Sequence, residues 1–140
     1  MRDLAQQLLA VEAASQSVSL THAPVAVAVA VAVCEKLRIS LTRFAGADGF
    51  NSLMRRALAL ARVEVPALHA IQVKPDGSLE GLEKLAADPS NGGVEAAVAV
   101  TANLLGLLVT FVGKPIMLKL VREAWPESSL DEQHWKIEPL

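Results

Sequence analysis

The chain of 140 residues contains no tyrosine, and aromatic residues make up only 4% of it. Aromatic side chains line most small-molecule pockets, so this composition does not favour a ligand-binding enzyme. Hydrophobic residues account for 52% of the chain and are mainly Ala, Val and Leu, which suit close packing of helices. A chain of this length fits one domain and can bury a core without disulfides or metals.

The single cysteine, Cys34, excludes an internal disulfide and is typical of a protein kept in a reducing compartment. Arg2 and Asp3 follow Met1 directly and no apolar signal core comes after them, so we expect a cytoplasmic protein. Cys34 falls at helical spacing with Leu37 and Leu41. This spacing predicts a buried thiol that packs as a small hydrophobic group and is not a nucleophile.

Residues that carry chemistry are not clustered along the sequence. His22, His69 and His134 stand far apart, and none has a second His or Cys at the spacing of metal ligands. Asn91-Gly92-Gly93 precedes an expected helix, but the chain contains neither phosphate-binding pattern, GxxxxGK[ST] or GxGxxG. We therefore predict no catalytic residue, no metal and no cofactor, and a protein that is not an enzyme.

Charge is distributed unevenly along the chain. Residues 33–74 carry a net charge of +4, whereas residues 75–140 carry −5. The two parts can attract each other within one fold or between subunits. Arg55, Arg56 and Arg62 in the basic part are candidate contacts for a partner or an anion. Nucleic-acid binding is the least favoured function, because no aromatic or Gly-rich recognition motif accompanies these arginines.

The most informative stretch is the apolar run of nineteen residues from Val94 to Val112, which contains one charge, Glu95, and one amide, Asn103. A helix that is apolar all round must be covered all round, by protein or by lipid. The length of the run and the basic residues after it fit a membrane span. Glu95 and Asn103 would be costly against lipid, so we favour a central core helix.

The other segments predict further helices. The Ala/Val alternation at 25–33 resembles a strand, but it continues without a breaker into residues at helical spacing. We therefore predict one helix over 25–45, ending at Gly46, and a third helix with Asp48 as its N-cap. Val65-Pro66 ends that third helix. Its expected core face excludes the polar and basic residues and consists of Phe50, Leu53, Met54, Ala57, Leu58 and Ala61.

Shorter elements are expected at both ends and between the long helices. A first helix is predicted over 3–19, with Glu12 turned away from its apolar stripe, and a last one over 115–125, preceded by Gly113 as a C-cap. A small β-hairpin is predicted over 70–81, with one or two helical turns at 82–87. We thus expect an all-α (mainly) fold, a bundle of four to five helices with one hairpin. Residues 1–126 would form a single domain, followed by an acidic tail over 127–140.

Four segments carry a resemblance to known proteins: CEKLR (34–38), GFNSLMRRALALARVEVP (49–66), KPDGSLEGLEKL (74–85) and LLGLLVTFVGKPIMLKLVREAWP (104–126). Over these segments, which span about two thirds of the chain, the sequence resembles a family of small bacterial proteins. The shared features are packing and turn patterns. No activity is attached to that family, so the resemblance implies no site residues.

These observations predict a protein–protein interaction or scaffolding module that forms homo-oligomers through apolar helix faces. Its expected partner is a second copy. Trp135 in the acidic tail is a candidate anchor for another protein, although we favour the alternative in which it folds back on its own domain. The alternatives are a single-span or membrane-associated accessory protein and a small nucleic-acid-associated regulator. The expected oligomer interface lies on the long apolar helix and consists of Leu104, Leu105, Leu108, Val109 and Val112.

Overall fold

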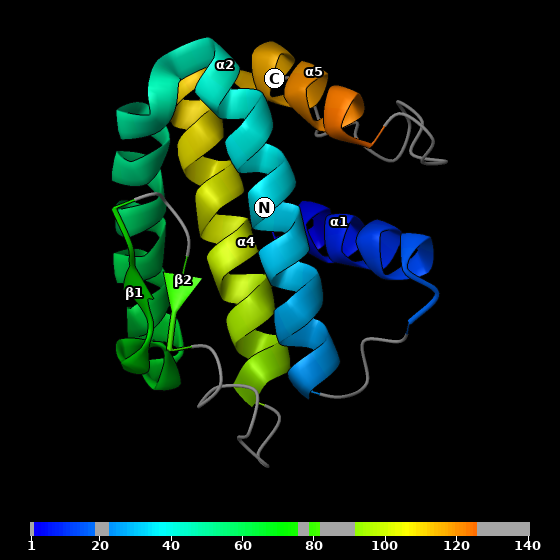
Figure 1. The fold of residues 1–140 in the computed structure, drawn as a ribbon, viewed down its shortest axis with the longest axis vertical. Helices are drawn as coiled ribbons and strands as arrows, with labels where there is room; N and C mark the ends of the chain where they lie inside the picture. The colour runs from blue at the N-terminus through cyan, green and yellow to red at the C-terminus, as the bar shows by residue number, and fades with distance from the viewer. Residues whose placement is uncertain (1, 19–22, 76–78, 82–91, 126–140) are drawn as a thin grey trace.

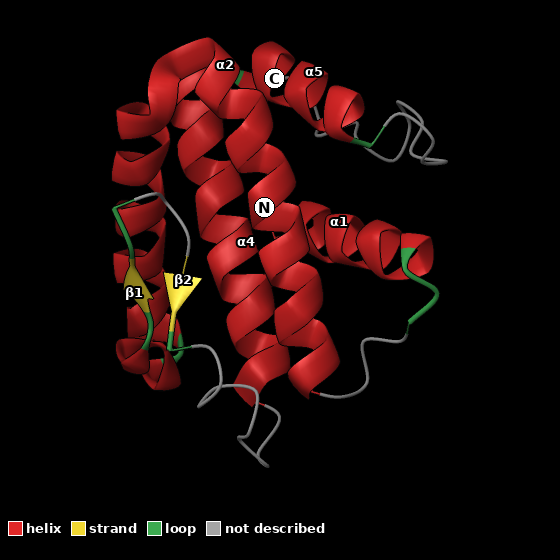
Figure 2. Cartoon of the chain, in the orientation of Figure 1, coloured by secondary structure: helices red, strands yellow, loops and turns green. Residues whose placement is uncertain are grey.

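Two long helices form the centre of the fold in the computed structural model (Figure 1), which describes residues 2–18, 23–75, 79–81 and 92–125. Helix α2 (Ala23–Glu64) folds back on itself, and both of its halves run alongside α4 (Gly92–Val112). Helices α1 (Arg2–Ser15) and α5 (Lys114–Ala124) each pack against both α2 and α4. Figure 2 shows that helices dominate the described chain, which confirms the prediction of a mainly α-helical bundle.

The Ala/Val run is helical, as predicted, and forms part of the first half of α2. The buried face of this helix contains both alanines and valines. A helix has 3.6 residues per turn, so a two-residue alternation in the sequence does not separate the two residue types onto different faces. Among residues 25–43, the buried positions are Ala26, Val27, Val29, Ala30, Val33, Cys34, Leu37 and Leu41. A strand would instead have placed all the valines on one face.

Two glycines with nearly the same backbone conformation set the bends between helices. Gly46 has φ 83° and ψ 164°, and Gly113 has φ 90° and ψ 156°, a region open almost only to glycine. The predicted helix end at Gly46 is therefore confirmed. The prediction of Asp48 as an N-cap is wrong, because Gly46 is the non-helical residue and Asp48 already lies inside the second helical half.

A small hairpin packs beside the second half of α2. Strand β1 (Gln72–Val73) pairs antiparallel with β2 (Leu79–Glu80), and a 3-10 helix, η1 (Pro66–Ala70), connects α2 to β1. The Asn51 side chain, buried although expected outside the core face, donates a hydrogen bond of 2.7 Å to the Pro75 carbonyl oxygen. This bond ties the end of β1 to α2. The helical turns expected at 82–87 lie outside the described residues.

Helix α1 ends at Ser15, four residues before its predicted end. The chain turns away at Ser17, which has φ 56°, and the Val18 N–H donates to the Ala13 carbonyl oxygen at 3.0 Å. Leu4 and Leu8 are buried against the central helices, as their spacing predicts.

Replacing Gly46 by alanine should lower the free energy of unfolding by about 1–3 kcal/mol, because an L side chain strains this backbone conformation. A Cβ atom there would meet no other atom within 4 Å, so the cost comes from the backbone and not from a clash. Urea unfolding followed by circular dichroism measures it. Ser52→Ala, at an exposed helical position, should change stability by less than about 0.5 kcal/mol. Equal stability of Gly46→Ala and the parent chain would contradict this account of the bend.

Candidate functional site

A buried carboxylate joins three helical elements. Glu12 of α1 is only 3% exposed, so the prediction that it turns away from the core is wrong. Its Oε1 accepts hydrogen bonds from Lys36 Nζ at 2.7 Å and from Trp125 Nε1 at 2.9 Å, and its Oε2 accepts one from Gln16 Nε2 at 2.7 Å. The Lys36 ammonium also lies 5.5 Å from the centre of the Trp125 ring, within cation–π range.

The balance of burial and hydrogen bonding keeps Glu12 ionised. Burial raises the pKa of this carboxyl, but the hydrogen bonds from Lys36, Gln16 and Trp125 outweigh it, and the pKa lies below its ordinary value. A charged acceptor strengthens each of these bonds. Since α1, α2 and the residue after α5 each supply a member, this cluster holds the outer helices on the central pair.

The Cys34 thiol is free and buried. Burial, and then the nearby charge of Glu35, raise the pKa of Cys34 to about 12. The cavity beside it has a volume of about 20 Å³ and is lined by apolar side chains including Val27 and Leu68. Such a space holds no more than one water molecule. The thiol is therefore protonated at neutral pH and almost entirely covered by apolar side chains.

Metal-ligand side chains are not grouped in the part of the chain that the structure describes. Within residues 2–18, 23–75, 79–81 and 92–125, no three His, Cys, Asp or Glu side chains lie close enough to hold an ion. His69 is exposed at the end of η1. His22 and His134 lie outside the described residues.

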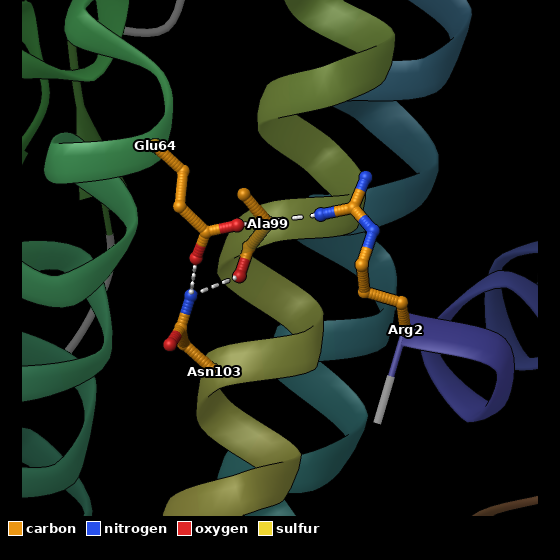
Figure 3. A network of polar contacts seen from close by, with 4 residues as sticks. All are labelled: Arg2, Glu64, Ala99 and Asn103. Carbon is orange, nitrogen blue, oxygen red and sulfur yellow. Dashed lines mark hydrogen bonds and ion pairs between the residues drawn. The ribbon is translucent and has the colours of Figure 1, made fainter.

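A polar network crosses the outer side of α4 (Figure 3). Arg2 reaches over from α1, and its Nη1 lies 3.3 Å from Oε1 of Glu64, at the end of α2. Asn103 of α4 donates from Nδ2 to Glu64 Oε2 at 2.9 Å and to the Ala99 carbonyl oxygen at 2.8 Å. The network therefore links α1, α2 and α4 at a place where no further helix covers α4 among the described elements.

An open groove of about 380 Å³, here named the α2–α4 groove, adjoins this network. Residues of three helices line it: Arg2, Leu60, Glu64, Ala102, Asn103, Gly106, Leu107 and Thr110. Leu60 of α2 is 41% exposed in the groove. Two further apolar residues are exposed on these helices, Val63 of α2 (83%) and Phe111 of α4 (55%). Exposed apolar side chains beside a groove are a common property of association surfaces.

Most residues of the predicted oligomer interface are already buried within one chain. Leu104, Leu105 and Leu108 have no exposed surface, because α2 and the other helices of the same chain cover that side of α4. They therefore cannot meet a second copy while this fold is kept. Val109 and Val112 are half-buried. The exposed side of α4 is instead the one that carries Gly106 and Thr110, which hydrophobicity does not single out.

The predicted partner contacts are separated by the fold. Arg55 and Arg56 are exposed on the second half of α2. Arg62 turns toward η1, where its guanidinium donates to the carbonyl oxygens of Leu68, at 3.3 Å, and Ile71. Arg62 thus holds the chain that follows α2. Because its guanidinium is engaged there, it does not join Arg55 and Arg56 in a common anion site. Trp135 lies outside the described residues.

Several residues of the groove were not identified from the sequence. Arg2 and Glu64 are far apart in the chain, and no periodicity connects them. Leu60, like Val63 outside the groove lining, is an exposed apolar residue on a side of α2 that also carries charged residues. An apolar residue at such a position is the one signal that could have been used.

One described helix is long and apolar enough to cross a membrane: Gly93–Val112, with a mean hydropathy of 1.8. In the single chain 56% of that stretch is already buried against protein. The core helix of a soluble protein satisfies the same criterion, so length and composition do not distinguish the two environments.

Replacing Glu12 by glutamine should lower the free energy of unfolding at pH 7 by about 1.5–3 kcal/mol, the range for hydrogen bonds to a charged group. The folded-state pKa of Glu12 lies below its ordinary value. The charge of Glu12 therefore stabilises the fold fully at any pH above that ordinary pKa. That contribution is lost as the pH falls through the folded-state pKa. The difference between parent and variant, measured by urea unfolding across pH, should therefore shrink under acid conditions.

The matched control for this experiment is Glu123→Gln, because Glu123 is exposed on α5. It should leave stability unchanged within about 0.5 kcal/mol. A Glu12→Gln variant as stable as the parent at pH 7 would show that the buried cluster does not hold the outer helices.

Comparison of the chain with models of protein families, with curated proteins and with solved structures gave no match. The resemblance to a family of small bacterial proteins therefore stays a prediction.

Proposed function

We propose that this chain is a non-enzymatic protein–protein interaction module that associates with copies of itself through the α2–α4 groove. The observation that carries the proposal is the incomplete cover of α4. Three of its leucines are buried within the chain, but its opposite side opens into a groove with Leu60 and Leu107 on its walls. Docking of a second protein surface would remove this apolar area from water.

The surface has the make-up of a contact between helices. Ala102, Gly106 and Thr110 follow one another at intervals of four residues along the groove. Small side chains at this spacing allow a second helix to approach closely. Leu60 provides an exposed apolar group in the groove, and Val63 and Phe111 are further exposed apolar residues of the same helices, α2 and α4. The charged residues of the groove belong to the Arg2–Glu64–Asn103 network, and Thr110 adds a hydroxyl further along α4.

Membrane association is the second candidate, and the length and hydropathy of residues 93–112 favour it. A span would require α4 to leave the helices that bury its leucines. Glu95 and Asn103 would then enter the lipid without compensation from water. Self-association needs neither step, and we therefore prefer it.

Replacing Leu60 by glutamate should shift the protein from an oligomer to a monomer. A charge placed among the apolar side chains of the contact should raise the dissociation constant roughly tenfold or more. Light scattering on a sizing column at several protein concentrations measures the change. Leu105 and Leu108 are unsuitable for this test, because an acidic residue at either fully buried position would unfold the chain.

The matched control is Ile39→Glu. Ile39 is 51% exposed on the first half of α2 and does not line the groove. This variant should remain an oligomer. A parent chain that is monomeric at all concentrations, or one that floats with lipid vesicles after mixing, would contradict the proposal, and the second result would favour the membrane candidate.

A further inference from the structure

We infer that two copies dock groove to groove about a two-fold axis, and that Arg2 and Glu64 exchange partners across it. This inference rests on the proposed self-association and specifies its geometry. In the dimer, Arg2 of each copy pairs with Glu64 of the other copy, in place of the contact within one chain seen in Figure 3.

The two charged side chains are available for such an exchange. Their side chains are 55% and 46% exposed, for Arg2 and Glu64 respectively. Among the described residues Glu64 is the hydrogen-bond partner of Arg2, and that bond uses one N–H of a guanidinium that has several. An exposed ion pair of this kind contributes little to the stability of one chain. Exchanging it for an equivalent pair between chains therefore costs little.

The surface meets the requirement of two-fold symmetry. In a two-fold dimer the same patch lies on both sides of the contact, so a patch with charges of one sign would repel itself. The groove carries a cation on α1 and an anion on α2, and they lie on opposite sides of α4 in Figure 3. A two-fold axis that runs along α4, between these two charges, places each cation opposite an anion. A second copy is therefore a partner whose charges complement this surface.

The floor of the groove can be covered without leaving the Thr110 and Asn103 donors unpaired. The Thr110 hydroxyl donates to the Gly106 carbonyl oxygen at 3.1 Å. The Asn103 amide nitrogen already donates to Ala99 and Glu64. Burying a donor that has lost its partner costs free energy, and these donors keep theirs within the helix or the network. Ala102 and Gly106 add no side chain that would hold the partner away.

The test uses two charge reversals and their mixture. Arg2→Glu places two carboxylates opposite each other at both contacts of the dimer, and Glu64→Arg places two guanidinium groups there. Each variant alone should be monomeric, with a dissociation constant raised roughly tenfold or more. A mixture of the two in equal amounts should form a heterodimer, because each contact then pairs opposite charges. Light scattering on a sizing column measures all three samples.

The mixture separates the exchange from a role within one chain. Neither variant can form the Arg2–Glu64 pair internally, and mixing does not restore it. Restored dimer in the mixture would therefore support the exchange, whereas monomers in the mixture would overturn it. Circular dichroism of each variant should match the parent, and the double variant Arg2→Glu/Glu64→Arg should be dimeric. Arg55→Glu, an exposed reversal outside the groove lining, is the matched control and should stay dimeric.

Failure of this inference differs from failure of the proposed function. If Leu60→Glu dissociates the oligomer but the charge reversals do not, the chain associates through the groove without the exchange. If the parent is monomeric, the proposed function fails and this inference fails with it.

Discussion

Covering the apolar surface of α4 is the constraint on which the other contacts of the fold depend. Its nineteen residues from Val94 to Val112 contain one charge, so contact with water is unfavourable on every side. Both halves of α2 lie against it, and α1 and α5 pack across the pair. Three leucines are thereby fully buried. A chain of this length has no further helix, among the described residues, for the side that carries Gly106, and that side remains as the groove.

The buried charge of Glu12 complements this apolar packing. Apolar contacts have no direction, so they do not by themselves select one placement of α1 and α5 on the central pair. A carboxylate with hydrogen bonds to Lys36, Gln16 and Trp125 does select one, because each donor must reach a particular oxygen. Its removal from water is compensated by these donors, which also keep its pKa low. The cluster and the groove lie on different parts of α1, at Glu12 and Arg2.

Much of the secondary structure could be predicted because it depends on local chemistry. The glycine at position 46, the Gly113–Pro115 pair and the turn signals of the hairpin each restrict the backbone directly. The Ala/Val run could be assigned to a helix because it continues without a breaker into apolar residues at helical spacing. Glu12, Asn51 and Arg62 were expected to face away from the core, and all three turn to partners within the fold, Glu12 to Lys36 and Trp125. Their partners come from other elements or from the chain after α2, which periodicity does not describe.

The sequence by itself determined the long helical segments, the breaks at Gly46 and Gly113 and which helix must be covered. Those properties follow from backbone restrictions and from the spacing of apolar residues along one element. Only the tertiary structure decided which side of α4 is covered. Leu104, Leu105 and Leu108 were expected at an oligomer contact, but the chain's own helices bury them. The side that carries Gly106, Leu107 and Thr110 stays open, because a helix that is apolar all round does not itself specify from which sides the other helices approach it.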